Sequence, residues 1–298
     1  MDQKLLKGLM DSMVKPEDIK FRFKGLIYGD PGARKTTEAC RIGNKLLFIM
    51  ADPEGWQSLI NHPELGLGTR IQLMEYNGVS QLEALAAAFD EDQKLVREFD
   101  TIILDTLSNI ASMDLGVVQK IAIDKKGTNA DGTDKFDYER DMWPVYNQNS
   151  LRVKTALQKL LHAPINVVAT AHAREIEVKR FGSATGERRL QPKFSPEIFA
   201  DINAQFSMIA YQQNDVQVDR QNNVTYRTST QFHPTSLIVA KTRIGGLPVQ
   251  QKNANIAKIV EEWVARGGQL MSPEEADTVH PDDQGIQAPV ASDLSDLI

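Results

Sequence analysis

The chain has 298 residues, of which 41% are hydrophobic and 25% charged, and its formal net charge is −6. This composition is typical of a soluble globular protein, with enough residues for one large core or two small ones. No run of about 18 apolar residues occurs, so we expect no membrane contact and a cytoplasmic location. The only cysteine is Cys40, which excludes an internal disulfide and fits a reducing compartment.

The acidity is concentrated at the carboxyl end of the sequence. Residues 272–298 contain seven of the 40 acidic residues and no Lys or Arg, so the remaining chain has 34 basic and 33 acidic residues. Prolines and glycines interrupt this segment, and its apolar residues follow no period. We therefore predict a disordered acidic tail over 271–298 behind a nearly neutral folded body.

The first 20 residues contain a predicted amphipathic helix over 4–14, which precedes a first strand over 21–28. The helix would dock on its own core or on a neighbouring subunit. Its apolar residues recur at helical spacing, and they are Leu5, Leu6, Leu9, Met10 and Met13.

The next segment, Gly29-Asp30-Pro31-Gly32-Ala33-Arg34-Lys35-Thr36, lies between an apolar strand and a helix. It matches the phosphate-loop pattern G-x-x-x-x-G-K-[ST] except at its second glycine, where Arg34 stands. Backbone N–H groups would surround the phosphates, with Lys35 reaching the β- and γ-phosphates and Thr36 binding Mg²⁺. A simple Gly-Pro turn would explain Gly29 to Gly32 but not the Lys-Thr pair. The predicted nucleotide ligands are Gly29, Asp30, Pro31, Gly32, Ala33, Arg34, Lys35, Thr36 and Thr37.

Two acidic groups follow apolar segments of strand length. The run 45–51 leads into Asp52-Pro53-Glu54-Gly55, and Glu54 is a candidate base for activating water. Glu54 could equally be an ordinary loop carboxylate, with Asp52 capping the next helix. After a predicted helix over 80–98, the strand 99–105 ends at Asp105, in the form of a Mg²⁺-binding carboxylate.

The second half of the chain continues the alternation of strands and helices. We predict a mobile loop over 124–137, a helix around 151–161, and a buried strand over 165–172 that ends at His172. His172 would sense the γ-phosphate or form a hydrogen bond within a loop. Further strands are predicted over 205–211, 224–232 and 237–240, and the last predicted helix spans 256–263.

Residues 173–194 predict a β-hairpin with a turn at 182–186. Basic side chains alternate with Phe181 and Phe194, as suits single-stranded nucleic acid. An ordinary solvent-exposed hairpin is the alternative. The candidate nucleic-acid ligands are Lys179, Arg180, Arg188 and Arg189.

Taken together, these segments resemble, in their order, the RecA-like ATPase core over roughly residues 21–265. The segment 52–55 looks like the strand-end acidic motif of RecA and RadA recombinases, in which the Glu positions the attacking water. The stretch Lys241-Thr242-Arg243-Ile244-Gly245 is similar to the Lys-x-Arg-x-Gly element of RadA-type proteins, whose basic pair reaches the ATP of a neighbouring subunit. Among RecA-like proteins, the likeness is greatest to phage ATPases of the Sak type, which are single-strand annealing proteins.

The resemblance implies a three-layer α/β P-loop NTPase core over 21–270 with a mostly parallel sheet. It further implies an ATPase that uses ATP and Mg²⁺, binds single-stranded DNA, assembles as a homo-oligomeric ring or filament, and works in the host cytoplasm if phage-encoded. The tail, which ends in acids alternating with apolar residues, would recruit a single-strand binding protein or another replication partner. ATP is expected rather than GTP because 44–47 lacks the Asp of a guanine-reading Asn-Lys-x-Asp. The implied catalytic residues are Glu54, Lys35, Asp105, His172, Lys241 and Arg243.

Two other functions remain open at this point. A hexameric helicase or motor would use the same core for processive unwinding. A nucleotide-binding scaffold without turnover would use the altered loop as a structural switch.

Overall fold

The computed structural model describes residues 21–91, 98–129, 131–180, 183–218 and 224–267. The predicted amphipathic helix over 4–14 and the predicted tail over 271–298 lie outside these residues. In the described part of the chain, no helix combines the length and the apolar character that crossing a bilayer requires.

The core is a mostly parallel sheet in the order β10-β8-β7-β1-β5-β4-β2-β3. The strand before the phosphate loop, β1, pairs in parallel with β5 on one side and β7 on the other. Because β5 also pairs with β4, it separates the strand of the loop from the strand of Asp105. The parallel strands are β1 (Lys24–Gly29), β2 (Leu46–Met50), β3 (Ile71–Glu75), β4 (Thr101–Asp105), β5 (Asn166–Arg180) and β7 (Met208–Val218).

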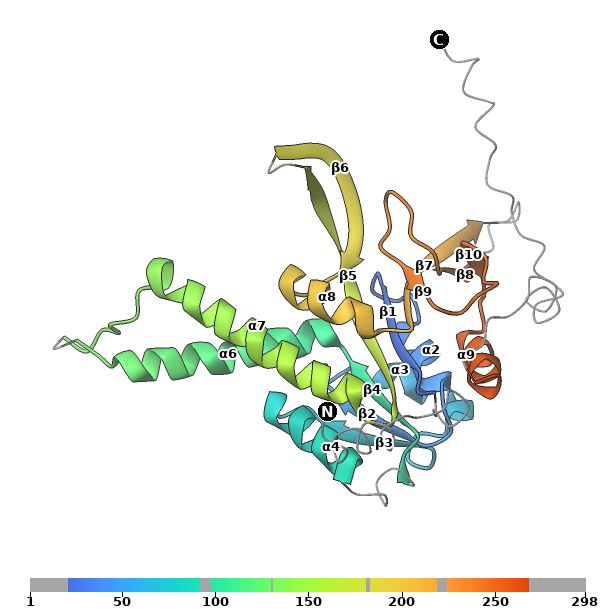
Figure 1. Ribbon diagram of the computed structural model, residues 1–298, viewed down its shortest axis with the longest axis horizontal. Helices are drawn as coiled ribbons and strands as arrows, with labels where there is room; N and C mark the ends of the chain where they lie inside the picture. Colours follow the sequence, from blue (N-terminus) through green and yellow to red (C-terminus); the bar gives the residue numbers. More distant parts are fainter. Residues whose placement is uncertain (1–20, 92–97, 130, 181–182, 219–223, 268–298) are drawn as a thin grey trace, which may run out of the picture.

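The remaining strands are antiparallel to their neighbours and extend the sheet at the carboxyl ends of the parallel strands. β5 continues past the sheet and turns back as β6, so the predicted hairpin is confirmed, although the strand does not end at His172. A second hairpin, β7–β8, extends beside it (Figure 1). These strands are β6 (Ser183–Pro192), β8 (Val224–Gln231), β9 (Lys241–Thr242) and β10 (Gln250–Lys252).

Helices cover both faces of the sheet, which confirms the predicted three-layer α/β fold (Figure 1). Alternate residues of β1 enter different cores: Leu26 and Tyr28 pack with the helices of one face, and Ile27 packs with those of the other. The first face carries α4 (Val79–Glu91), α6 (Leu107–Lys126), α7 (Tyr138–His162) and α8 (Pro196–Ile202), followed by the 3-10 turn η3 (Asn203–Gln205). The second carries α2 (Lys35–Arg41), α3 (Gln57–Ile60), the 3-10 turn η2 (Pro63–Leu65) and α9 (Ile256–Ala265).

Helices α6 and α7 form a long antiparallel pair that projects from the body (Figure 1). Its outer part has a small core of its own around Val118, Phe136 and Val145. α6 continues to Lys126 and α7 begins at Tyr138, so the predicted loop over 124–137 is shorter than expected. The early start of α7 follows from Asp137, whose carboxylate accepts hydrogen bonds from the first turn of the helix.

The predicted buried strand over 237–240 is wrong. Leu237 is 61% exposed, and Ile238 makes only an isolated bridge to Leu190. The apolar run finds no free edge, because β1 and β8 occupy the two sides of β7. The stretch instead packs under β6, where Val239 N–H donates to the Leu190 carbonyl at 3.0 Å.

The start of β1 is attached to the turn between α7 and β5. The Lys24 ammonium is buried and donates to the carbonyls of Ala163, at 2.8 Å, and Ile165. Burial lowers the pKa of Lys24 from 10.5 to about 7, aided by the charge of Arg22 and opposed by that of Asp90. The folded chain therefore releases this proton at a pH where the unfolded chain still holds it.

We expect Lys24 to make stability increase with pH. Between pH 7 and 10.5 the unfolded chain binds the extra proton, so the free energy of unfolding rises by at most about 1.4 kcal/mol per pH unit. Lys24→Met, which cannot titrate, should lack this increment. Urea unfolding of both proteins at pH 7 and pH 9 measures the difference in slope, and identical slopes would contradict the assignment.

Candidate nucleotide-binding site

The predicted phosphate loop lies where β1 leaves the sheet and α2 begins. At Gly29 the backbone of β7 comes so close that a Cβ atom would lie 1.8 Å from the Gln212 carbonyl oxygen, so only glycine fits. Asn214, also on β7, donates from its amide to the Gly32 carbonyl at 2.9 Å. The edge of β7 therefore fixes both ends of the loop's glycine-containing half.

Lys35 opens α2 and its side chain is buried. Its ammonium donates to the Asp30 carbonyl at 2.7 Å, so it folds back over the loop. Burial lowers the pKa of Lys35, and the carboxylates of Asp105 and Asp30 oppose this shift. The ammonium thus lies inside the loop, where an incoming phosphate could replace the carbonyl as its partner.

Asp105, at the end of β4, is the most buried carboxylate of the site. Its two oxygens have different partners: the Thr36 hydroxyl donates to one at 3.1 Å, and the Thr170 hydroxyl of β5 donates to the other. Burial raises the pKa of Asp105, and the two hydroxyl donors and Lys35 oppose the rise, whereas Asp52 adds to it. A buried carboxylate in this setting is stabilised by a cation.

The pairing of Thr36 with Asp105 fits a Mg²⁺ ion. Mg²⁺ prefers oxygen ligands, keeps several waters and takes the rest of its shell from a few protein groups and substrate phosphates. Among the described residues, no three His, Cys, Asp or Glu side chains come together as a metal cage. The protein's part of the shell would therefore be the Thr36 hydroxyl and Asp105.

The acidic segment after β2 passes directly over Asp105. The N–H groups of Ala51 and Asp52 donate to the Asp105 carbonyl at 2.8 and 3.2 Å, and a Cβ atom on Gly55 would lie 2.8 Å from the Asp105 carboxylate. Glu54 is exposed next to this contact, with its N–H bound to the Asp52 carboxylate at 3.2 Å. The backbone thus brings Glu54 to the same edge as Lys35, with its carboxylate open to solvent.

His172 lies opposite Gly29 in the pairing of β5 with β1, level with the start of the loop. Its N–H donates to the Ser108 hydroxyl at 3.1 Å, and its ring atom Nδ1 is buried without a partner among the described residues. Burial lowers the pKa of His172, and the nearby Lys35 and Lys193 lower it further, so the neutral imidazole is favoured. A neutral ring with an unused nitrogen suits a hydrogen bond to a ligand in the loop.

Lys241 and Arg243 lie apart from this cluster, on and just after β9. Lys241 donates to the carbonyls of Asn203 and Ala204 at 2.8 and 3.1 Å, and Arg243 also donates to Ala204. Both cations thus bind the carbonyl end of α8 and η3 within their own chain.

The β5–β6 hairpin carries the candidate nucleic-acid ligands. Arg188 is exposed and pairs with Glu175 at 3.1 Å, and Arg189 is partly buried. The side chains of Lys179 and Arg180 lie outside the described residues. The described part of the hairpin is therefore partly charge-compensated on its surface.

Arg34 adopts the backbone conformation that the missing glycine would favour. Its φ is 59° and its ψ is 21°, in the left-handed region, and its side chain is exposed. Non-glycine residues pay roughly 1–2 kcal/mol there. The loop therefore keeps its shape despite the departure from the motif, at the expense of local strain.

Replacing Arg34 with glycine should stabilise the protein by roughly 0.5–1 kcal/mol, because relief of strain exceeds the entropy that glycine adds to the unfolded chain. The opened space should also raise nucleotide affinity or turnover. Arg34→Ala is the matched control, since it removes the guanidinium but keeps the Cβ atom. Urea unfolding and binding of a fluorescent ATP analogue measure both effects. Loss of binding in both variants would instead identify Arg34 as a phosphate ligand.

Thr170 and Asn214 were not found from the sequence. The signal for Thr170 was available: residues two apart on a strand share a face, so Thr170 points to the same side as His172. Asn214 had no such signal, because its contact with the loop depends on which strand lies beside β1.

The chain also matches a known protein family, described as "AAA domain", over residues 22–244. No curated protein matches. Among solved structures, the chain is similar to one described as an "ATPase Domain", at 12% identity and a TM-score of 0.40, over 84% of this chain and 92% of that one. It is also similar to the Legionella pneumophila ATPase DotB, at 10% identity and a TM-score of 0.27, over 78% of this chain and 49% of that one.

Proposed function

The chain belongs to the AAA domain family, and on that premise we propose that it is an ATPase whose nucleotide state controls single-stranded DNA held at the β5–β6 hairpin. Its biological role would be strand annealing or recombination, in the manner of the phage Sak-type proteins it resembles. ATP with Mg²⁺ would supply the phosphate transferred to water. The protein's own groups would bind, orient and polarise.

Each site residue has a role that follows from its position. Lys35 would exchange the Asp30 carbonyl for a phosphate oxygen, and Thr36 with Asp105 would hold the metal. Glu54 would orient and activate the attacking water, because its carboxylate is free at this edge of the sheet. His172 would hydrogen-bond to the terminal phosphate from the neighbouring strand.

One observation carries the proposed coupling: a single strand, β5, runs from the loop into the hairpin. His172, opposite Gly29, accepts a hydrogen bond on its carbonyl from Lys193 N–H at 2.7 Å, just past the end of β6. Tyr28, the residue before the loop, donates to the carbonyls of Leu190 and Val239 at 3.2 and 2.6 Å. A displacement at the phosphate end of β1 or β5 would therefore reach the hairpin through continuous hydrogen bonds.

The proposal includes a homo-oligomer, ring or filament, in which Lys241 and Arg243 act on the nucleotide of a neighbour. To do so they would leave the carbonyls of η3, to which they are bound in the single chain. Arginine suits this role because its planar fork can take two phosphate oxygens.

ATP hydrolysis with and without single-stranded DNA tests the proposed function. We expect wild type to hydrolyse ATP faster with DNA, and Lys35→Ala to lose on the order of a hundredfold or more in turnover, because it removes a cation from the phosphates. Nucleotide binding without hydrolysis under either condition would favour the scaffold function instead. Processive duplex unwinding would favour a motor.

DNA binding by the hairpin is tested separately. Removing Arg188 and Arg189 together should weaken binding of single-stranded oligonucleotides and flatten its salt dependence by up to about 1.4 in the log–log slope, since each lost phosphate contact releases fewer counterions. Lys120→Ala/Lys125→Ala removes two exposed charges from α6 and is the matched control. An unchanged slope in the hairpin variant would leave it an ordinary solvated hairpin.

A further inference from the structure

A groove runs between α4 and the carboxyl-terminal half of α7. It encloses about 540 Å³ and is lined by Ala86 and Ala87 of α4 and by Thr155, Gln158 and His162 of α7. The groove exists because α4 presents alanines where larger side chains would fill the space against α7. An ion pair between Lys159 and Glu83, at 2.7 Å, spans the two helices at its rim.

The described chain begins at one end of this groove. Arg22 donates from its guanidinium to the Pro164 carbonyl at 2.9 Å, and Lys24 donates to the neighbouring Ala163 carbonyl at 2.8 Å. Pro164 is two residues after His162, which lines the groove. The segment before Phe21 therefore emerges beside the groove.

That segment has the right pattern and length to fill the groove. Residues 4–14 carry five large apolar residues on one helical face, whereas Lys4, Lys7 and Asp11 fall on the opposite face. As a helix these 11 residues would span about 16 Å. The groove follows α7 for about 10 Å from His162 to Thr155, and the seven residues 15–21 can bridge up to about 23 Å.

We propose that residues 4–14 pack as an amphipathic helix into the α4–α7 groove of the same chain. Their leucine and methionine side chains cover Ala86, Ala87 and Thr155. The charged face of the helix remains in water.

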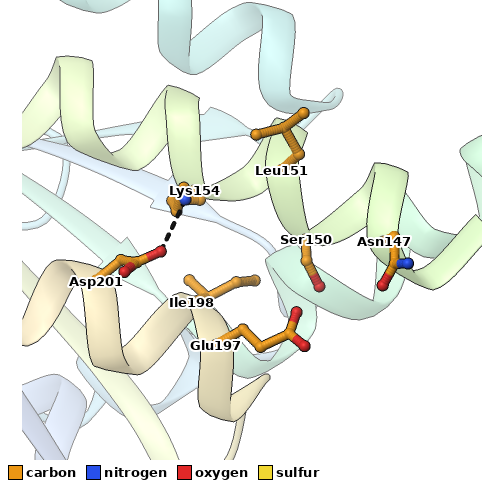
Figure 2. Close-up of a pocket in the computed structure, with 7 residues that line it drawn as sticks. All are labelled: Asn147, Ser150, Leu151, Lys154, Glu197, Ile198 and Asp201. Carbon is orange, nitrogen blue, oxygen red and sulfur yellow. Dashed lines mark hydrogen bonds and ion pairs between the residues drawn. The ribbon is translucent and has the colours of Figure 1, made fainter.

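A second groove, between α7 and α8, is a poorer match. Figure 2 shows Lys154 and Asp201 joined across it, at 2.7 Å, with the carboxylate of Glu197 and the exposed Leu151 on its walls. It encloses only about 170 Å³. Its middle, at Ser150, lies about 18 Å further along α7 from His162.

Cysteine pairs test the position of the segment. The native Cys40 is wholly buried and stays silent. Met10→Cys with Ala87→Cys should form a disulfide under mild oxidation, giving a species of monomer mass on a non-reducing gel. Lys7→Cys with Ala87→Cys is the matched control, because Lys7 lies on the opposite face of the proposed helix. A product of dimer mass would overturn the proposal in favour of a neighbouring copy. Linkage of Met10→Cys to Leu151→Cys instead, or to neither partner, would overturn it as well.

Thermal unfolding of the full chain gives a second measurement. Leu9→Asp and Ala87→Asp should each lower the melting temperature by roughly 5 °C, and the double variant should lose little more, because both disrupt one interface. Ala84→Asp, on the exposed surface of the same helix, should leave it unchanged. Additive losses in the double variant would show that the two positions do not meet.

Discussion

The site depends on one buried carboxylate. Asp105 is only 2% exposed, and burying a negative charge is unfavourable unless neighbouring groups compensate it. Three elements supply that compensation: α2 provides Thr36, β5 provides Thr170, and the Lys35 ammonium lies nearby. Because these elements adjoin β4 only in this strand order, the position of β5 between β1 and β4 is the constraint from which the rest of the site follows.

The site could be predicted from the sequence as far as it is encoded locally. The loop from Gly29 to Thr36, the acid ending β4 and the level of His172 all depend on short patterns whose spacing fixes their place at the sheet edge. Side-chain alternation along strands then explains why Thr170 and His172 share a face. The role of Thr170 was missed because its partner belongs to a strand 65 residues earlier in the sequence.

Long-range pairing explains the remaining errors. The stretch 237–240 has the composition of a buried strand, yet composition cannot show that both sides of β7 are already occupied. The strand β3 escaped notice because only Ile71 is fully buried and its other residues are partly or largely exposed. The nature of the contacts made by Lys241 and Arg243 was likewise hidden, since their partners are backbone carbonyls, which any sequence provides.

The strand order also bears on how the hairpin could respond to nucleotide. Its base is attached at three places, through Tyr28, through the Lys193 N–H on the His172 carbonyl, and through the Val239 N–H on the Leu190 carbonyl. Two of these attachments involve residues within one position of the loop, or level with it. Outside the sheet, by contrast, β5 and β6 pair only with each other along the hairpin, and the pairing shifts register between Glu177 and Lys179. A firmly attached base and an irregular outer part suit a lever that transmits displacement from the loop and adapts its tip to a flexible ligand.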